Sequence, residues 1–237
     1  MIHFTPQIDF LKGILTDGFK VKYCVEDNVV RSGKISGAIP MISFCDIPLS
    51  EIKNHISKYG SYGIGLKKDW AIKNNLNPVL YLECNSLLGD SLRSAMIEYT
   101  KKDGDKKRTE TQIKLMDVAR YIKNYQRDLT RNGIEYKDYR FYDEREWRYV
   151  PDLYHEPIVV TLKQYSNPAK KKELNELAAK IILKFQPNDI SYIFLNEDNE
   201  ISEFIEFIRK CFKKFPLEEV DILITRIMTV KQIYNDF

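Results

Sequence analysis

Apolar residues recur at helical spacing in several segments of the chain. The first helix is predicted to start with Thr5 as its N-cap and Pro6 at its first position, and to end at Gly18, a natural C-terminal stop. The clearest amphipathic stripe lies in residues 201–212, where apolar positions fall three or four apart. Further helices are predicted over residues 67–75, 88–100 and 168–179.

Short apolar runs bounded by turn residues predict strands between these helices. The predicted strands span residues 2–4, 40–45, 62–66, 79–84, 157–162, 181–185, 190–195 and 220–225. Residues 30–39 contain two glycines and predict a mobile loop. The strands are too short and too irregularly spaced for a doubly wound parallel sheet. The pattern therefore predicts an α+β fold with a compact mixed or antiparallel sheet core.

The segment from residue 88 to residue 134 has a helical character. A long helix capped by Thr109 or Thr111 carries an apolar stripe that ends at Gly133. We expect this segment to be a helical insertion between two strands of the core. The chain length of 237 residues fits one large domain, so a single α+β domain over residues 1–237 is predicted.

The stretch of residues 136–151 is dense in aromatic and charged side chains. If residues 140–150 form a strand, their period of two places Glu144, Glu146 and Arg148 on one face. An ionised carboxylate beside Arg148 can bind a sugar hydroxyl or stabilise developing positive charge. The alternative is a solvent-exposed ladder of ion pairs. The neighbouring aromatic residues favour a partly buried, specific surface over that alternative.

Composition narrows the class of partner only slightly. A net charge of +3 permits a nucleotide or nucleic-acid partner without requiring one. The four cysteines form no C-x-x-C pair, and with three scattered histidines they make no zinc signature, so no metal is expected. The chain has no signal-peptide pattern and no apolar run near the ~20 residues of a membrane span. We expect a cytoplasmic protein with reduced thiols and no membrane partner.

Several motifs resemble the AbiGi abortive-infection family of bacterial phage-resistance proteins. The two most specific are I-P-M-I-S-F-C-D-I-P-L-S at residues 39–50 and Y-D-E-R-E-W-R-Y-V-P at residues 142–151. Shorter ones are H-F-T-P at residues 3–6 and H-x-x-x-Y-G-x-Y-G-I-G at residues 55–65. Members of this family are described as antitoxins of a two-gene system. The resemblance implies a role in anti-phage defence with a cognate toxin or antitoxin protein as partner.

A more distant likeness carries an explicit chemistry. The opening H-F-T, a short helix and G-F are similar to the start of DarT-type ADP-ribosyltransferases, which implies that fold and NAD as substrate. The likeness implies that His3 holds the nicotinamide ribose, that Tyr62 stacks on nicotinamide and that Glu146 binds the ribose 2′-hydroxyl. Glu144 would then engage a nucleic-acid or protein acceptor. The NAD-binding side chains expected from the likeness are His3, Thr5, Ser43, Tyr62 and Arg148.

Three functions follow from these patterns. The first is an NAD-dependent ADP-ribosyltransferase, with Glu146, Glu144 and His3 as catalytic residues; a carboxylate beside the ribose would stabilise its oxocarbenium-like transition state. The second is a non-catalytic antitoxin that keeps the fold and binds a toxin, because the strand around Ser43 lacks the S-T-S pattern of such enzymes. The third is a metal nuclease, whose ligands would come from residues without metal-ligand spacing: Asp46, His55, Asp143 and Glu144.

Overall fold

The computed structural model describes residues 1–99, 109–131, 133–152 and 159–236, and all statements about structure refer to these ranges. The chain forms two compact units. Unit 1 comprises Met1–Lys20, Ser43–Leu76 and Ile182–Phe237, and unit 2 comprises Val21–Ile42 and Asn77–Ile181. The architecture is mixed α+β, as the sequence predicts. The expectation of a single domain stays a prediction.

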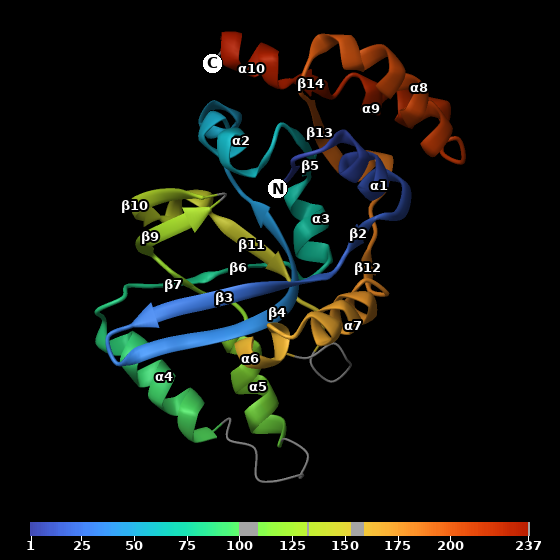
Figure 1. Ribbon diagram of the computed structural model, residues 1–237. Helices are drawn as coiled ribbons and strands as arrows, with labels where there is room; N and C mark the ends of the chain where they lie inside the picture. The colour runs from blue at the N-terminus through green and yellow to red at the C-terminus, as the bar shows by residue number, and fades with distance from the viewer. Residues whose placement is uncertain (100–108, 132, 153–158, 237) are drawn as a thin grey trace. The chain divides into compact units, whose positions relative to one another are not determined.

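Unit 1 is built on a mixed sheet (Figure 1). Its strands follow the order β14, β13, β5, β1, and Ile2 at the start of β1 also pairs with Cys45 at the end of β4. Strands β13 and β14 are parallel, whereas β13–β5 and β5–β1 are antiparallel. The bounds are β1 (Ile2–Thr5), β4 (Gly33–Cys45), β5 (Tyr62–Leu66), β13 (Ile190–Leu195) and β14 (Ile227–Thr229).

Helices of unit 1 supply an apolar cluster that packs against this sheet. The cluster contains the buried residues Ile2, Ile47, Ile52, Ile56, Phe194, Val230 and Ile233. The helices of unit 1 are α1 (Ile8–Asp17), α2 (Lys53–Tyr59), α3 (Lys68–Lys73), α8 (Ile201–Cys211), α9 (Leu217–Ile224) and α10 (Val230–Asp236). The short strands β2 (Phe19–Lys20) and β12 (Ile182–Leu183) form an additional antiparallel pair.

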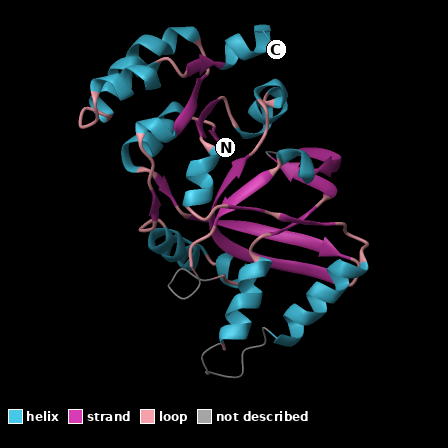
Figure 2. Ribbon diagram, turned by 180° about the vertical axis from the view of Figure 1, so that it is seen from behind, coloured by secondary structure: helices cyan, strands magenta, loops and turns pink. Residues whose placement is uncertain are grey.

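Unit 2 consists of paired strands with helices beside them (Figure 2). A long hairpin joins β3 to β4; β11 pairs with β6, β7 with β8, and β9 with β10. These strands are β3 (Lys22–Val30), β6 (Asn77–Pro78), β7 (Leu80–Leu82), β8 (Ile122–Asn124), β9 (Gln126–Arg131), β10 (Ile134–Arg140) and β11 (Glu146–Tyr149). The helices are α4 (Leu87–Tyr99), α5 (Glu110–Ala119), α6 (Leu162–Tyr165) and α7 (Pro168–Ala178).

Helices predicted from strong periodicity are confirmed. Helix α8 carries the stripe of residues 201–212 with Phe204 and Ile208 buried, and α7 begins at Pro168 after the N-cap Asn167. Helix α1 ends at Gly18 as predicted, but it begins at Ile8, so placing its start at Thr5 was wrong. Thr5 is the last residue of β1, because its backbone pairs with β5.

Three other predictions were wrong because pairing partners decide them. Residues 30–39 belong to a strand hairpin rather than a mobile loop: β3 ends at Val30, residues 31–32 form the turn, and β4 begins at Gly33, with φ +142°. Residues 220–225 are helical, because Val220 and Leu223 of α9 are buried at helical spacing. The helix over residues 109–133 stops at Ala119, and β8 and β9 follow it. The strand predicted at residues 157–162 was also wrong for the described part of it: Val160 forms only an isolated bridge with Ala38, and Leu162 begins α6, while residues 157 and 158 lie outside the described residues.

None of the helices in the described ranges combines the length and hydrophobicity needed to cross a bilayer. The four cysteines are partly buried.

Candidate functional site

The motif Y-D-E-R-E-W-R-Y does not form the continuous strand predicted for residues 140–150. Residues Phe141–Glu144 form a 3-10 turn, and Arg145 follows in the left-handed region with φ 44°. Strand β10 ends at Arg140, where its pairing with β9 ends. Strand β11 starts afresh at Glu146, so Glu146 and Arg148 share one face as predicted, whereas Glu144 reaches the same neighbourhood from the turn.

Both oxygens of the Glu146 carboxylate accept bonds from cationic side chains. Oε1 lies 2.7 Å from Arg148 Nε, and Oε2 lies 2.5 Å from Lys123 Nζ. The backbone N–H of Glu146 donates to the Tyr81 hydroxyl oxygen at 2.9 Å. Tyr81 and Lys123 are direct partners in the parallel β7–β8 pair, which explains why both reach Glu146. The carboxylate is only 4% exposed.

Glu144 uses its two oxygens in the same way. Oε2 lies 3.3 Å from Lys123 Nζ, and Oε1 accepts a hydrogen bond from the Tyr139 hydroxyl at 2.9 Å. The Lys123 ammonium also lies 5.1 Å from the centre of the Phe141 ring. A single, partly buried cation therefore bridges both carboxylates, which offsets the repulsion between two negative charges.

Arg148 completes this group of buried charges. Its guanidinium is fully buried, contacts Glu26 at 3.0 Å through Nη2 and donates from Nη1 to the Arg120 carbonyl at 2.7 Å. Glu26 belongs to β3. We call Glu26, Lys123, Glu144, Glu146 and Arg148 the charge network. It holds three carboxylates and two cations, and all five side chains come from unit 2.

A reciprocal pair of asparagines aligns β3 with β8 and so brings Glu26 towards Lys123. Asn28 Nδ2 donates to the Ile122 carbonyl at 3.0 Å, and the Asn124 N–H donates to Asn28 Oδ1 at 3.0 Å. Asn124 in turn bonds both backbone groups of Val29, accepting at 2.8 Å and donating at 2.7 Å. Both amide side chains are buried. These four bonds replace a regular strand ladder and satisfy buried backbone groups.

The network favours the charged forms of Glu146, Lys123 and Arg148. Burial alone would raise the pKa of Glu146, but Arg148 and Lys123 outweigh it and hold that pKa far below its ordinary value. Burial would lower the pKa of Lys123, but Glu146, Glu144 and Glu26 outweigh it and raise that pKa well above the ordinary value. The same balance with Glu146 and Glu26 raises the pKa of Arg148.

We expect the charge network to weaken in acid. Because the folded pKa of Glu146 is depressed, its contribution is complete above the unfolded value near 4.5 and is lost as the pH falls towards the folded value. Urea unfolding of Glu146→Gln should therefore depend less on pH below about pH 5 than that of the natural chain. Glu110→Gln, at an exposed site paired with Lys114, is the control. An equal pH dependence in all three proteins would contradict this assignment.

The remaining predicted site residues lie in unit 1. His3, Thr5 and Tyr62 share one face of the β1–β5 pair, because Thr5 lies opposite Tyr62 and His3 lies two residues from Thr5. His3 Nδ1 lies 2.9 Å from the Ser43 carbonyl, so the contact uses the backbone of Ser43. The Ser43 side chain falls on the face of Cys45, two residues along β4, and Cys45 pairs with Ile2.

His3 lies in an aromatic environment rather than a polar one. Its ring centre is 5.3 Å from that of Phe19 and 5.7 Å from that of Phe44. Burial lowers its pKa, partly offset by the bond to the Ser43 carbonyl. Tyr62 donates to Glu200 at 2.7 Å, and burial together with this bond raises its pKa to about 12. Both side chains are neutral at pH 7.

We expect NMR to show the pKa of His3 below the ordinary histidine value of about 6.5. The sign follows from burial, which disfavours the imidazolium in the folded protein. Folding stability is then lost as the pH falls from 6.5 towards the folded pKa, because the unfolded chain binds the proton first. A Phe44→Ala variant, which opens one wall around the ring, should move the titration back towards 6.5. A His3 titration at or above 6.5 in the natural chain would contradict the aromatic packing.

The predicted site residues fall into two groups, one in each unit. Glu144, Glu146 and Arg148 meet in unit 2, and His3, Thr5, Ser43 and Tyr62 lie in unit 1. Their assignment to an NAD site stays a prediction. Sequence reasoning missed Lys123 and Glu26, because nothing in the local pattern links β8 and β3 to the motif. Among the described residues, no cluster of three or more His, Cys, Asp or Glu side chains is arranged to hold a metal ion.

Comparison with known proteins identifies relatives of the chain. Residues 17–196 match the family described as "Putative abortive phage resistance protein AbiGi, antitoxin". The chain is 31% identical over 224 residues to the abortive phage resistance protein AbiGi of Lactococcus lactis subsp. cremoris. That alignment covers 84% of this chain and 89% of the relative. No solved structure matches the chain.

Proposed function

Because the chain belongs to the AbiGi family of abortive phage resistance proteins, we propose that it acts as an antitoxin: a non-catalytic protein that binds and restrains a cognate toxin. One observation carries the proposal beyond the family description. All four carboxylate oxygens of Glu144 and Glu146 already accept bonds from side chains of the protein. A ribose hydroxyl would have to compete with these partners at a buried position, which is costly.

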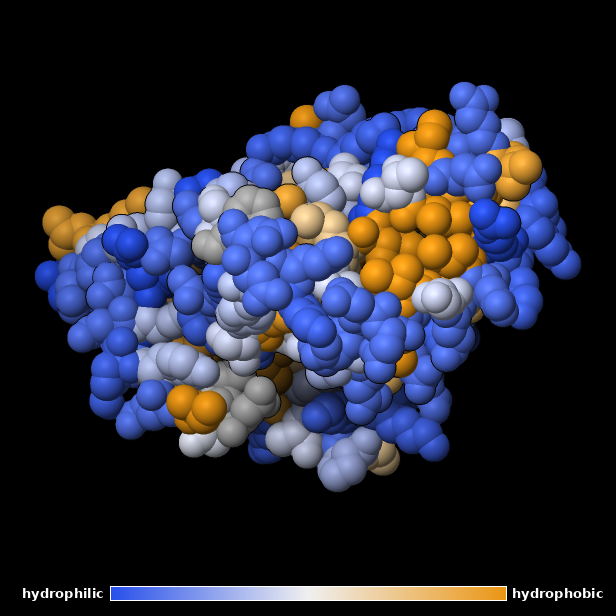
Figure 3. All heavy atoms as spheres, turned by 90° about the horizontal axis from the view of Figure 1, so that it is seen from above, coloured by the Kyte–Doolittle hydropathy of each residue, from blue (hydrophilic) through white to orange (hydrophobic). Residues whose placement is uncertain are grey.

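The protein surface offers apolar area for a protein partner. Figure 3 shows hydrophobic atoms gathered in a continuous area framed by hydrophilic residues. Exposed apolar side chains in unit 1 include Leu217, 68% exposed, and Ile222, 41% exposed, both on α9. Contiguous apolar surface of this kind is typical of protein–protein contact sites. This property supports binding rather than catalysis.

Co-expression tests the antitoxin proposal. The protein encoded beside this chain in the two-gene system is expressed alone and together with it, and growth and co-purification are measured. We expect arrest with the partner alone, and growth plus a stable complex when both are present. Leu217→Glu and Ile222→Glu should weaken the complex, whereas Glu206→Gln, an exposed polar change on α8, should not. Arrest that this chain never relieves would overturn the proposal.

A second candidate, an NAD-dependent ADP-ribosyltransferase, rests on the ionised Glu146 held beside Arg148 on one strand face. For that function Glu146 must leave Lys123 and bind the nicotinamide ribose. Its NAD would be a substrate, and its acceptor would be a nucleic acid or a protein. Such a fixed carboxylate would stabilise the oxocarbenium-like centre formed on loss of nicotinamide.

Turnover of labelled NAD by the purified protein, with and without nucleic acid or cell lysate, distinguishes the two candidates. The antitoxin proposal predicts no release of nicotinamide and no transfer of label. The transferase predicts turnover that falls by about 10²–10³-fold in Glu146→Gln, on the scale of one preorganised electrostatic group. Glu135→Gln, an exposed change on β10, is the matched control. Turnover lost only in Glu146→Gln would establish the transferase and overturn the non-catalytic assignment.

A further inference from the structure

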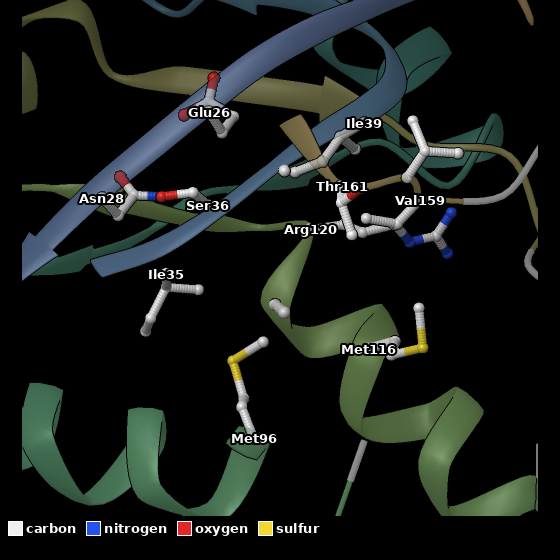
Figure 4. A pocket seen from close by; sticks show the side chains of 13 residues that line it. Glu26, Asn28, Ile35, Ser36, Ile39, Met96, Met116, Arg120, Val159 and Thr161 are labelled. Carbon is white, nitrogen blue, oxygen red and sulfur yellow. The ribbon is translucent and has the colours of Figure 1, made fainter. Parts of the chain in front are cut away.

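Unit 2 contains a pocket of about 180 Å³ outside the part of the charge network formed by Glu144 and Glu146 (Figure 4). One wall is a face of the β3–β4 hairpin, and the opposite wall comes from α4 and α5. The register explains the first wall: Glu26 lies opposite Gly37, and Asn28 lies opposite Ile35, so these positions share one face. All residues that line the pocket belong to unit 2.

The two broad walls are apolar. Ile35 and Ile39 lie four residues apart on β4, so their side chains point to the same face. Figure 4 shows both on the strand side of the pocket. Met96 of α4 and Met116 of α5 reach in from the helices below them. Methionine side chains are flexible and polarisable, and they adapt to flat aromatic surfaces. The pocket is therefore a slot between branched aliphatic residues and two adaptable thioethers.

The polar groups of the pocket are few and specific. Arg120 is 2% exposed; its Nη atoms bond the Pro151 carbonyl and Asp117, but its buried Nε has no hydrogen-bond partner. Glu26, partly exposed, uses Oε1 for Arg148. The lining thus includes one carboxylate with further accepting capacity and one N–H donor that is buried within the wall and lacks an acceptor. A buried donor without a partner is rare, and it marks a place where an acceptor gains most.

Charge balance limits what can bind here. Arg120 is paired with Asp117, and Arg148 is paired with Glu26 and Glu146, so the cations around the slot are already neutralised. A free anion would meet the Glu26 carboxylate, and a free cation would meet the guanidinium groups. Either ion would lose its hydration shell on entering the slot and would find no unpaired opposite charge there. The ligand that fits these groups is uncharged and carries both a donor and an acceptor.

Size limits the ligand further. Pockets for drug-sized molecules are commonly about 300–1,000 Å³, whereas an apolar cavity of about 150 Å³ accommodates a benzene ring. A pocket of about 180 Å³ takes one flat ring system. We propose that this slot binds a nucleobase, the planar uncharged heteroaromatic group of a free base, nucleoside or nucleotide. The ring of the base lies between Ile35 or Ile39 and the two methionines. An N–H of the base donates to Glu26. A ring nitrogen or carbonyl of the base accepts from Arg120 Nε once the Met116 side chain has moved aside.

Calorimetric titration of the full chain with adenine, guanine and cytosine tests the proposal. Concentrations up to about 5 mM are needed, because a ligand with so few atoms binds weakly. We expect saturable one-to-one binding of at least one base. Further titrations with adenosine and adenosine monophosphate show whether the pocket also accepts the sugar or the phosphate. Binding of none of these ligands would overturn the proposal.

Variants that fill the slot locate the binding. Ala119→Phe inserts a ring from α5, and Met96→Trp inserts one from α4; each should weaken binding by about tenfold or more. Their matched controls are the neighbouring exposed positions Val118→Phe, 43% exposed, and Ile97→Trp, 44% exposed, which should bind as the natural chain does. Cooperative thermal unfolding checks that each variant is folded. Undiminished binding in both folded filling variants would overturn the site.

This proposal goes beyond the antitoxin function and does not depend on it. Base binding without toxin restraint, or restraint without base binding, would separate the two proposals. Base binding that survives Glu146→Gln would also separate the slot from any NAD chemistry at Glu146.

Discussion

Replacement of Arg148 by alanine is expected to lower the free energy of unfolding by about 3–5 kcal/mol. Arg148 is fully buried and pairs with both Glu146 and Glu26. Removing the guanidinium leaves two carboxylates facing each other without their shared cation, and Lys123 alone cannot neutralise both. The Arg120 carbonyl also loses its donor. Urea unfolding followed by circular dichroism measures the change in the midpoint at constant slope.

The matched control is Arg140→Ala, eight residues earlier in the chain. Arg140 bridges Asp143 at 2.8 Å, but both side chains are about half exposed. Exposed pairs contribute below about 1 kcal/mol, so the control should change little. Arg148→Lys, which keeps the charge but not the planar fork, should recover only part of the loss. Equal effects of Arg148→Ala and Arg140→Ala would mean that the charge network does not hold unit 2 together.

Replacement of Gly60 by alanine should destabilise unit 1 by about 3 kcal/mol. Gly60 ends α2 with φ 122° and ψ 164°, a backbone region that only glycine adopts readily. A Cβ at this position would lie 2.6 Å from Pro6 Cα and would press on the carbonyl of Thr5. The neighbours are backbone atoms that link β1 to α1, so they cannot rotate aside as a side chain can. Thermal unfolding of the variant measures the loss.

Gly13→Ala provides the comparison for Gly60→Ala. Gly13 lies within α1, and a Cβ there would meet nothing within 4 Å. Alanine is the better helix former, so this substitution should stabilise the protein by up to about 1 kcal/mol. The two glycine substitutions are therefore expected to change the free energy of unfolding in opposite directions. A Gly60→Ala variant as stable as Gly13→Ala would contradict the close approach of α2 to the start of the chain.

These expectations bear on function because they separate folding from chemistry. If the E-R-E-W-R motif holds unit 2 together, substitutions in it will reduce phage resistance through lost stability as well as through any lost activity. Measurements on Glu146→Gln therefore need both an unfolding midpoint and an activity assay. The antitoxin proposal predicts that restraint of the toxin follows the fraction of folded protein, whereas the transferase predicts a loss of turnover at full folding.

Much of the local structure could be predicted from the sequence, because local periodicity controls it. Helix α8 follows from apolar residues spaced three and four apart, and the terminal helix α10 follows from Thr229, whose hydroxyl accepts from the Gln232 N–H at 3.2 Å. The buried strand β13 follows from a continuous apolar run. The family could also be predicted, since its long motifs are contiguous in the chain. These features need only neighbouring residues.

The identity of the candidate site depended on pairing between distant segments. The sequence predicts a partly buried surface at this motif, and Glu146 and Arg148 do point inwards while Trp147 is only partly buried. These inward charges are stable because Lys123 arrives from β8 and Glu26 from β3, and the two supply opposite charges at a largely buried position. Both lie more than twenty residues away in sequence from Glu146, and neither belongs to a recognisable motif.

The sequence by itself thus determined the α+β class, the strongest helices and the family, because these depend on short-range spacing and on contiguous motifs. Only the tertiary structure decided that residues 30–39 belong to a strand hairpin, that the strand predicted across residues 140–150 breaks at Arg145, and that Lys123 and Glu26 supply the counter-charges of the motif. The physical reason is the same in each case. Hydrogen-bond partners and counter-charges come from segments far apart in the chain, and the free energy of burying them depends on all partners being in place.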